Sequence, residues 1–163
     1  MSAYEICPLR TETEMDEKGY VHWKCWHESY QGLMPDEYLK NITLEKCVQM
    51  AHRWPQNTFV IKVNGKVVGF SCFGESKDVP GANEIIALYL LKEYHGQKLG
   101  YELMKQTVLQ FSDKKEAVLW VLDGNDTAIR FYKRFGFEFT GETKTLPFGT
   151  ELQMRMKNIL LHK

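Results

Sequence analysis

The sequence has no excess of charge of either sign. Its 163 residues include 21 lysines and arginines and 21 aspartates and glutamates, so the formal net charge is zero. Domains dedicated to nucleic acids or other polyanions usually carry a basic surplus. We therefore expect no nucleic-acid partner, and any anion that the protein binds must be held by a few local groups.

Cysteines are few and hydrophobic runs are short. The four cysteines form no Cys-x-x-Cys motif, and a chain of this length needs no disulfide for stability. The first residues lack the basic start and apolar run of a signal peptide. The longest uninterrupted apolar run, 85–91, is well short of the roughly 20 residues that cross a bilayer. These absences predict a reduced, cytoplasmic protein without membrane contact.

Metal-ligating residues do not occur at the spacing of a common zinc site. His22, Cys25 and His27 lie close together, with Cys47 and His52 further along the chain. His22 and His27 would not share one face of a helix well, because helical neighbours are three or four residues apart. We expect no metal, and packing roles for these side chains.

The remaining composition is that of an ordinary folded domain. Hydrophobic residues make up 44% of the chain and charged residues 26%, which is typical of soluble globular proteins and argues against disorder. No repeat, low-complexity tract or linker divides the sequence. We therefore expect a single domain over residues 1–163.

The first third of the sequence predicts one strand followed by helices. Residues 4–10 could form the strand. From about Glu14, large side chains recur at steps of three and four residues, which is the period of a helix. These side chains are Tyr20, Trp23, His27 and Tyr30. Gly32 is placed to end this helix, and the proline and two acids at 35–37 begin a second helical stretch that continues to about His52.

The rest of the sequence predicts a hairpin, two strand–helix units and a second hairpin. The pair Asn64-Gly65 between two strand-like runs is typical of a type I′ turn. Residues 84–91 are continuously apolar, as in a strand that is covered on both faces. The other elements are strands at 58–63, 66–74 and 117–122, helices at 98–111 and 125–135, and a hairpin of 137–144 with 150–157. This order predicts an α+β fold.

A glycine-bearing loop joins the apolar strand to the next helix. Gly96 and Gly100 flank the predicted start of that helix, where unpaired N–H groups and the helix dipole favour an anion such as a phosphate. The same glycines would also suit a tight turn without a ligand, and both interpretations stay open. Neither the P-loop pattern nor the Gly-x-Gly-x-x-Gly pattern of dinucleotide folds occurs.

Two segments resemble the GCN5-related N-acetyltransferase (GNAT) superfamily. Residues 84–104, EIIALYLLKEYHGQKLGYELM, are similar to the family's cofactor strand and pyrophosphate loop. Residues 120–137, WVLDGNDTAIRFYKRFGF, contain the family's Asn…Ala…Phe-Tyr…Gly-Phe block. The resemblance implies a mixed, mostly antiparallel, twisted sheet of six to seven strands with about four flanking helices, in the order β-α-α-β-β-β-α-β-α-β-β.

Acetyl-CoA is the cofactor that this resemblance implies. In the family the pantetheine arm hydrogen-bonds the central strand as an added strand would, and the pyrophosphate lies on amides at the start of the following helix. The implied cofactor residues are Leu88, Tyr89, Leu90, His95, Gly96, Gln97, Lys98, Leu99, Gly100, Tyr101, Asn125, Ala128 and Tyr132.

The loop departs from the family pattern Gln/Arg-x-x-Gly-x-Gly/Ala at two positions. His95 stands in place of Gln/Arg, and Lys98 stands in place of the first glycine. Lys98 could contact the phosphates directly. Alternatively, its side chain could point into solvent, as lysine side chains usually do.

The resemblance also implies two groups that move protons. Glu84 aligns with the glutamate that is the general base in the histone-acetyltransferase branch, and the alternative is a strand-edge carboxylate facing solvent. Tyr132 would protonate the departing thiolate of CoA, and the alternative is a core aromatic residue. A base is useful because an amine with a pKa of ~10.4 is almost fully protonated at pH 7.

The acceptor implied by the resemblance is a primary amine that binds beside the first helices. The candidate acceptor residues are Trp23, Trp26, His27, Tyr30 and Met34, about half of which could instead pack these helices on the sheet. A small molecule, a polyamine and a protein N-terminus all fit this site. The rival function is a non-catalytic module that binds CoA or acyl-CoA, and the family resemblance also suggests a homodimer.

Overall fold

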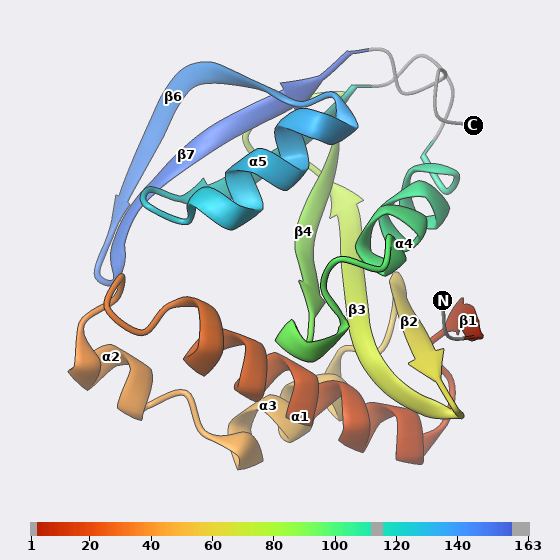
Figure 1. Ribbon diagram of the computed structural model, residues 1–163. Coiled ribbons are helices and arrows are strands. Elements are labelled where there is room, and N and C mark those ends of the chain that lie inside the picture. The colour runs from red at the N-terminus through yellow and green to blue at the C-terminus, as the bar shows by residue number, and fades with distance from the viewer. Residues whose placement is uncertain (1–2, 112–115, 158–163) are drawn as a thin grey trace.

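A seven-stranded twisted sheet forms the centre of the protein (Figure 1). The computed structural model describes residues 3–111 and 116–157. Residues 1–2, 112–115 and 158–163 of the expected domain lie outside the described part. The strands are β1 (Tyr4–Pro8), β2 (Thr58–Val63), β3 (Lys66–Glu75), β4 (Asn83–Leu90), β5 (Ala117–Leu122), β6 (Glu138–Leu146) and β7 (Gly149–Met156). The helices are α1 (Glu12–Ser29), α2 (Asp36–Lys40), α3 (Leu44–Arg53), α4 (Leu99–Val108) and α5 (Asp126–Phe135), with a 3-10 turn η1 (Lys92–Tyr94).

The sheet is mixed and mostly antiparallel. Its strand order is β1-β2-β3-β4-β5-β7-β6, and β4–β5 is the parallel pair. The predicted α+β class, the mostly antiparallel sheet and the seven strands are therefore confirmed. None of the described helices is long and apolar enough to span a membrane, and the four cysteines are free thiols.

Three helix boundaries differ from the prediction. The stretch from 35 to 52 is two helices, because α2 ends at Lys40 and Thr43 begins α3 by accepting a hydrogen bond from the Lys46 N–H. α1 ends at Ser29, before Gly32, which adopts a positive φ of 85° in the following turn. α4 ends at Val108 rather than at residue 111. Capping and turn residues thus end each helix earlier than its hydrophobic pattern does.

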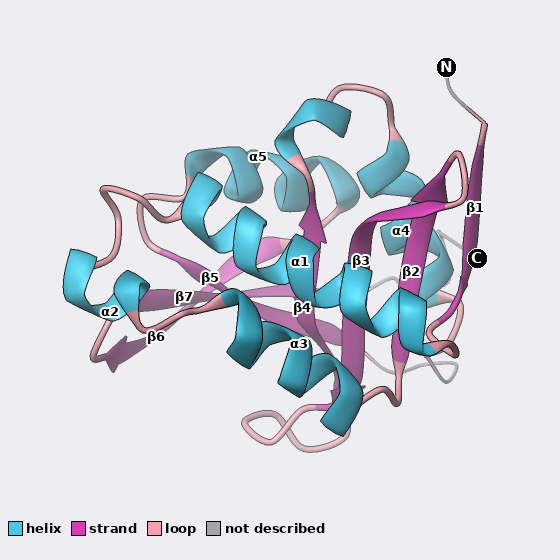
Figure 2. Cartoon of the chain, turned by 90° about the horizontal axis from the view of Figure 1, so that it is seen from below, coloured by secondary structure: helices cyan, strands magenta, loops and turns pink. Residues whose placement is uncertain are grey.

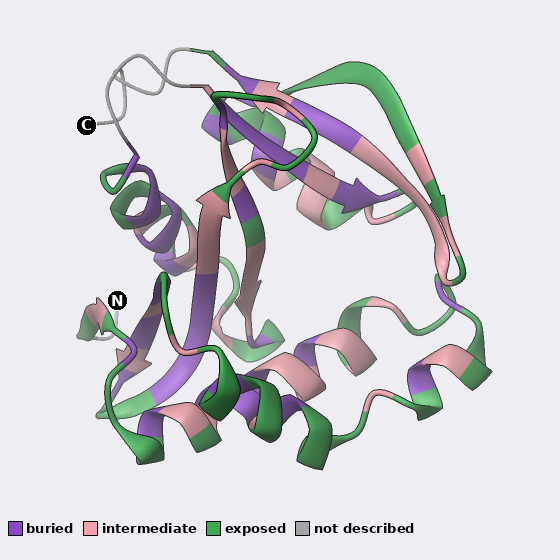
Figure 3. Cartoon of the chain, turned by 180° about the vertical axis from the view of Figure 1, so that it is seen from behind, coloured by how far each residue is buried: buried purple, intermediate pink, exposed green. Residues whose placement is uncertain are grey.

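Helices cover the two faces of the sheet unequally. α1 packs on β3 and β4, and α3 lies beside α1 (Figure 2). The two helices approach closely at Gly19, where an added Cβ would lie 2.6 Å from the Val48 Cα. α4 packs on β2, β3 and β4 and shares a core with α5 and β5. Seen from behind, no described helix lies over β5, β7 and β6 (Figure 3). We call this helix-free side the open face, although the loop that carries Asp78 reaches over it to Trp120 and Lys144.

The central strand β4 is irregular where the sequence predicts a fully covered strand. Ala87 is opposite Cys72 and Ile85 is opposite Phe73, so Ile86 is an extra residue in β4, a β-bulge. Ile86 is 58% exposed. The prediction of cover on both faces is therefore wrong, because the apolar residues of β4 also line a cavity that opens beside the strand.

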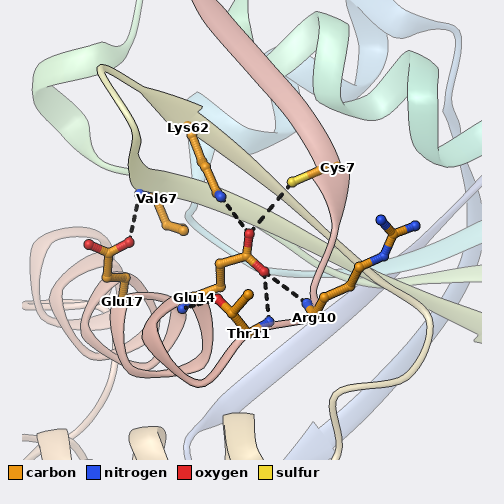
Figure 4. A network of polar contacts seen from close by, with 7 residues as sticks. All are labelled: Cys7, Arg10, Thr11, Glu14, Glu17, Lys62 and Val67. Atoms are coloured by element: carbon orange, nitrogen blue, oxygen red, sulfur yellow. Dashed lines mark hydrogen bonds and ion pairs between the residues drawn. The ribbon is translucent and has the colours of Figure 1, made fainter.

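A buried carboxylate at the start of α1 joins this helix to the sheet (Figure 4). Glu14 accepts hydrogen bonds from the backbone N–H groups of Arg10 and Thr11, each at 2.9 Å, and Thr11 Oγ1 accepts one from the Glu14 N–H at 3.1 Å. This capping box satisfies N–H groups that the first helical turn leaves unpaired. The Lys62 ammonium on β2 lies 2.5 Å from Glu14 Oε2. The ion pair therefore fixes α1 to β2.

These contacts make Glu14 a strong acid. Burial raises the pKa of its carboxyl, but the hydrogen bonds from Lys62, Thr11 and Arg10 outweigh burial and lower the pKa from 4.5 to about 2. A lowered native pKa stabilises the fold fully above pH 4.5, and this stabilisation is lost as the pH falls towards 2. Since one pKa unit corresponds to about 1.4 kcal/mol, the shift is worth roughly 3 kcal/mol.

We expect Glu14→Gln to lower the free energy of unfolding by about 2–3 kcal/mol at pH 7, because Lys62 loses its partner and the cap is weakened. The difference from the unmodified protein should shrink between pH 5 and pH 2, as measured by urea unfolding. Glu12→Gln, an exposed change in the same turn, is the control and should cost about 1 kcal/mol or less. A deficit that stays constant down to pH 2 would contradict this role.

Candidate active site

The strands β4 and β5 separate soon after they begin to pair. Only residues 83–85 pair with residues 117–119. Beyond this point the edge of β4 that faces β5 has no strand partner among the described residues. A cavity of about 680 Å³ opens there, bordered by both strands, by the start of α4 and by α5. Backbone groups in such an edge need partners, so the cavity suits an extended ligand.

The loop between β4 and α4 closes one end of the cavity. His95 Nε2 donates a hydrogen bond to the Leu90 carbonyl oxygen at 2.9 Å, which ties the loop to the end of β4. Gly96 has a φ of 80°. At Gly100 an added Cβ would lie 3.5 Å from the Phe131 ring, an ordinary contact. The free N–H groups of the first turn of α4 therefore border an open space that can hold an anion.

Lys98 occupies the position of the missing family glycine in a conformation that favours glycine. It is the N-cap of α4, with φ 65° and ψ 8° in the left-handed region, and no side chain caps the helix there. A side chain in this region costs about 1–2 kcal/mol. The Lys98 side chain is exposed. The backbone turn of the family loop is therefore formed despite the substitution, at a cost in stability.

The structure brings the predicted cofactor residues together around this cavity. All of them line it except Gln97, which is half-buried in the loop. Asn125 begins α5, and its Oδ1 accepts a hydrogen bond from the Ala128 N–H at 3.4 Å. Residues that the sequence did not single out also line it, among them Ile86, Trp120 and Phe131.

Three tyrosines, Tyr30, Tyr89 and Tyr132, line the cavity beside the part of β4 that has separated from β5. The hydroxyl oxygens of Tyr30 and Tyr89 are 3.1 Å apart. Tyr132 lines the cavity with 9% of its surface exposed, and no hydrogen bond from the described residues reaches its hydroxyl. Burial, with a smaller contribution from Tyr30, raises the pKa of Tyr132 well above 10. The Tyr132 phenol is therefore neutral, and its O–H is available to a ligand in the cavity.

The predicted acceptor residues have mixed positions. Tyr30 lines the cavity. Trp26 and Met34 pack with Tyr30, Phe148 and Leu122 where the loop between α1 and α2 meets the hairpin of β6 and β7. The remaining two face other partners: His27 Nε2 donates to the Ile42 carbonyl oxygen at 2.9 Å, and the Trp23 ring lies against His27. Of the five, only Tyr30 borders the cavity directly.

The predicted base, Glu84, lies on the open face of the sheet. It is half-buried, at the first residues of β4. Burial raises the pKa of its carboxyl, as do the nearby carboxylates of Asp78 and Glu151, whereas the Lys144 ammonium and a hydrogen bond from Ser76 lower it. Glu84 does not line the cavity itself. Burial therefore shifts the pKa of this carboxyl upward from 4.5, which is the direction that favours a general base.

Glu151 is an acid of this face that the sequence analysis missed. Glu151 lies on β7, opposite Leu122 of β5. It is half-buried, and burial raises the pKa of its carboxyl. The alternation of Leu152, Met154 and Met156 already indicates that Glu151 points to the other side of the strand. Only the sheet order, which places β7 beside β5, shows that this side faces Glu84.

Cys25, Cys47 and His22 pack in the interior, whereas the exposed His52 contacts Asp16 at 2.7 Å. His22 stacks on Tyr89 and contacts the edge of Phe70. Burial, with a smaller contribution from Lys18, lowers its pKa to about 4, so it is neutral at pH 7. In the part of the chain that the structure describes, no three His, Cys, Asp or Glu side chains lie close enough to hold a metal ion.

Comparison with known proteins assigns the fold and the family. A sequence profile of the Acetyltransferase (GNAT) family matches residues 17–137, which is more than half of the chain. The chain belongs to this acetyltransferase family. The predicted family and fold are thereby confirmed. The profile includes β4, the loop with Lys98, α4 and the tyrosine of α5, so the cavity lies within the part that defines GNAT proteins.

Curated GNAT relatives match part of the chain. An uncharacterized N-acetyltransferase of Schizosaccharomyces pombe is 38% identical over 81 residues, which are 48% of this chain and 49% of the relative. A probable spermine N(1)-acetyltransferase of Bacillus subtilis subsp. natto is 30% identical over 86 residues, 48% of this chain and 57% of the relative. The chain thus spans about half the length of these curated relatives.

Solved GNAT structures match nearly the whole chain. The PaiA N-acetyltransferase of Thermoplasma acidophilum, in complex with coenzyme A, has a TM-score of 0.72 at 21% identity and covers 95% of this chain and 99% of its own. The yncA protein of Salmonella typhimurium, a putative acetyltransferase solved with acetyl-CoA, has a TM-score of 0.70 at 16% identity, covering 96% and 94%. At these identities the likeness shows the fold.

We expect Lys98→Gly to raise the free energy of unfolding by about 1 kcal/mol, because glycine adopts the left-handed conformation without strain. The exposed side chain has no partner in the described structure, so the dissociation constant for CoA, measured by calorimetry, should change less than threefold. A tenfold weaker affinity would instead assign the ammonium to the CoA phosphates. Gly100→Leu is the contrasting variant: its side chain enters the cavity and should weaken CoA binding without loss of stability.

Proposed function

We propose that this chain transfers an acetyl group from acetyl-CoA to a primary amine. The amine nitrogen attacks the thioester carbonyl carbon, the C–N bond forms, the C–S bond breaks and CoA leaves as a thiol. The observation that carries the proposal is the cavity along the unpaired edge of β4, which is lined by the first residues of α4 and by Tyr132 of α5. We include residues 1–163 as one N-acetyltransferase domain, acting in the cytoplasm.

The edge of β4 supplies the groups that hold the cofactor in this proposal. The pantetheine arm would pair with backbone groups of residues 88–90, and the pyrophosphate would lie on the amides of residues 95–101. An N–H near Leu90 would polarise the thioester carbonyl oxygen. Support comes from the two structural neighbours, whose titles state that they contain coenzyme A or acetyl-CoA.

Glu84 is the proposed general base. An acceptor amine enters as an ammonium ion, so one proton must leave before attack. The raised pKa of Glu84 brings it closer to the range in which a carboxylate accepts a proton effectively. Glu84 lies outside the lining of the cavity, so the proton would travel through at least one water molecule.

Tyr132 is the proposed general acid. Its hydroxyl has no acceptor among the described residues and lies in the cavity lining. A thiol has a pKa of about 8.5, below the raised pKa of the Tyr132 phenol, so Tyr132 stabilises the departing sulfur by donating a hydrogen bond as the C–S bond breaks. The sulfur then takes up the proton that the attacking nitrogen releases. The free O–H also argues against the rival function, a module that binds CoA without turnover.

The acceptor is proposed to bind on the open face beside Glu84. The aromatic cluster of Trp26, Tyr30 and Phe148 lies at one end of that face, and the carboxylates of Glu84, Glu151 and Asp78 lie on it. The B. subtilis relative is named as a spermine acetyltransferase, so polyamines belong in a panel with amino acids and peptide N-termini. Release of CoA thiol from acetyl-CoA with this panel tests the function, and CoA binding without release for any amine would favour the binding module. A homodimer is part of the proposal and is tested by light scattering.

We expect Tyr132→Phe to lower kcat by roughly 10- to 100-fold, because the developing thiolate loses its hydrogen-bond donor. The dissociation constant for CoA should change less than threefold, since the ring remains. Steady-state thiol release and calorimetry measure the two effects. Tyr20→Phe removes an exposed hydroxyl on α1, outside the cavity lining, and is the control. An unchanged kcat would remove Tyr132 from the acid role.

We expect Glu84→Gln to lower kcat/KM at least tenfold at pH 7 and to flatten the acidic limb of its pH profile. In the unmodified protein kcat/KM should fall as the pH drops through the pKa of Glu84, which burial places above 4.5. Glu75→Gln, at the exposed end of β3, is the control. An acidic limb that keeps its shape in Glu84→Gln would move the base to another residue.

A further inference from the structure

On the open face of the sheet, the Lys144 ammonium contacts a carboxylate and the face of an aromatic ring. Lys144 of β6 lies 2.9 Å from Asp78 Oδ2, and its Nζ is 4.1 Å from the centroid of the Trp120 ring. The Trp120 indole N–H donates to the same Asp78 oxygen at 3.1 Å. Trp120 also lines the cavity. A carboxylate and an aromatic face at the edge of the active site therefore already bind a primary ammonium.

Two carboxylates beside this ammonium have no ion pair. Lys144 is opposite Glu151 in the β6–β7 hairpin, but its ammonium contacts Asp78 instead. Neither Glu84 nor Glu151 forms a salt bridge within the described part of the chain. Both are half-buried, and burial raises the pKa of each carboxyl; the charge of Glu151 raises the pKa of Glu84 further, while the Lys144 ammonium lowers both. Since a desolvated carboxylate needs a partner, the lack of a direct ion pair leaves room on this face for an added cation.

Glu151 also lies close to the tyrosines where the reaction is proposed to occur. It is level with Leu122, three residues beyond the last residue of β5 that pairs with β4. Its charge acts on the Tyr30 hydroxyl, which is hydrogen-bonded to Tyr89. On β5, Val118 is opposite Glu84, Leu122 is opposite Glu151, and Trp120 of the cavity lining lies between them on the same face. Glu151 and Glu84 therefore share the face of the sheet that borders the cavity at Trp120.

We propose that Glu151 is a specificity-determining residue that, together with Glu84, selects acceptors carrying two positive charges, such as diamines. The proposal rests on the acetyl transfer proposed above and names its acceptor class. One ammonium group loses a proton to Glu84 and reacts, and the second pairs with Glu151. Lys144 supplies part of the missing charge when no acceptor is bound, and it competes with the acceptor for the same carboxylates.

The test compares 1,4-diaminobutane with butylamine in the intact protein and in Glu151→Gln, by thiol release from acetyl-CoA. We expect KM for the diamine to rise at least tenfold and KM for the monoamine to change less than threefold, with kcat nearly unchanged. The acidic limb assigned to Glu84 should move to lower pH, because the variant removes a carboxylate charge that raises the pKa of Glu84. Of the nearby groups, Asp78 still raises this pKa, and Lys144 and Ser76 still lower it. Equal changes in KM for both amines, or a loss of kcat with both, would overturn the proposal.

Two further variants separate charge from structure. Lys144→Met removes the competing ammonium and keeps most of the side chain, so KM for the diamine should fall and the Glu84 limb should move to higher pH. Glu142→Gln, at an exposed position of the same hairpin, should change neither quantity. A rise in KM for the diamine in Lys144→Met would contradict the competition.

The role of Glu151 can also be tested if the protein does not transfer an acetyl group. If the unmodified protein releases no thiol with any amine, acetyl transfer is refuted. Calorimetric titration of 1,4-diaminobutane and of butylamine into the protein with CoA still tests Glu151. Preferential binding of the diamine that is lost in Glu151→Gln supports the acceptor class, and equal binding of the two amines overturns it.

Discussion

In the described part of the chain, the missing strand partner on the β5 side of the second half of β4 is the constraint on which the rest of the structure depends. Backbone groups in a sheet normally pair on both sides, but the parallel ladder with β5 ends at Ile85 and Leu119. The bulge at Ile86 bends β4 at this point. His95 satisfies the last carbonyl, that of Leu90. The remaining edge faces the cavity, so an extended ligand can complete the sheet in place of a strand.

The separated strands also bring two unlike environments to one point. On one side the first turn of α4 and the loop of residues 95–98 present N–H groups to the cavity. On the open face lie the carboxylates of Glu84, Glu151 and Asp78. The tyrosine cluster lies between them, where the acyl group would be transferred. An anionic cofactor and a cationic acceptor could thus approach the same carbonyl from opposite sides without sharing a binding surface.

Local sequence patterns predicted most of the fold, because those features are encoded within short segments, and the family resemblance implied the cofactor residues, most of which line the cavity. The hairpin at Asn64-Gly65, the strand at 117–122 and the helix start at Asn125 need only neighbouring residues. The bulge at Ile86 and the exposure of β4 could not be predicted, because they follow from the partner strands. Glu151 was missed for the same reason: alternation shows which way it points, but only the insertion of β7 between β5 and β6 brings it near Glu84.

A chain without net charge must separate charge locally if it is to bind an anion and a cation. The loop before α4 meets this need with backbone dipoles and keeps Lys98 at an unfavourable φ of 65°, so the turn matters more there than the residue type. The acceptor face uses side chains, and it leaves two carboxylates unpaired while Lys144 is held by Asp78. Because unpaired, partly buried charge destabilises a fold, it persists at a site where a ligand compensates it. The energetic costs at Lys98 and at Glu84 and Glu151 therefore coincide with the proposed cofactor side and the proposed acceptor side of the site.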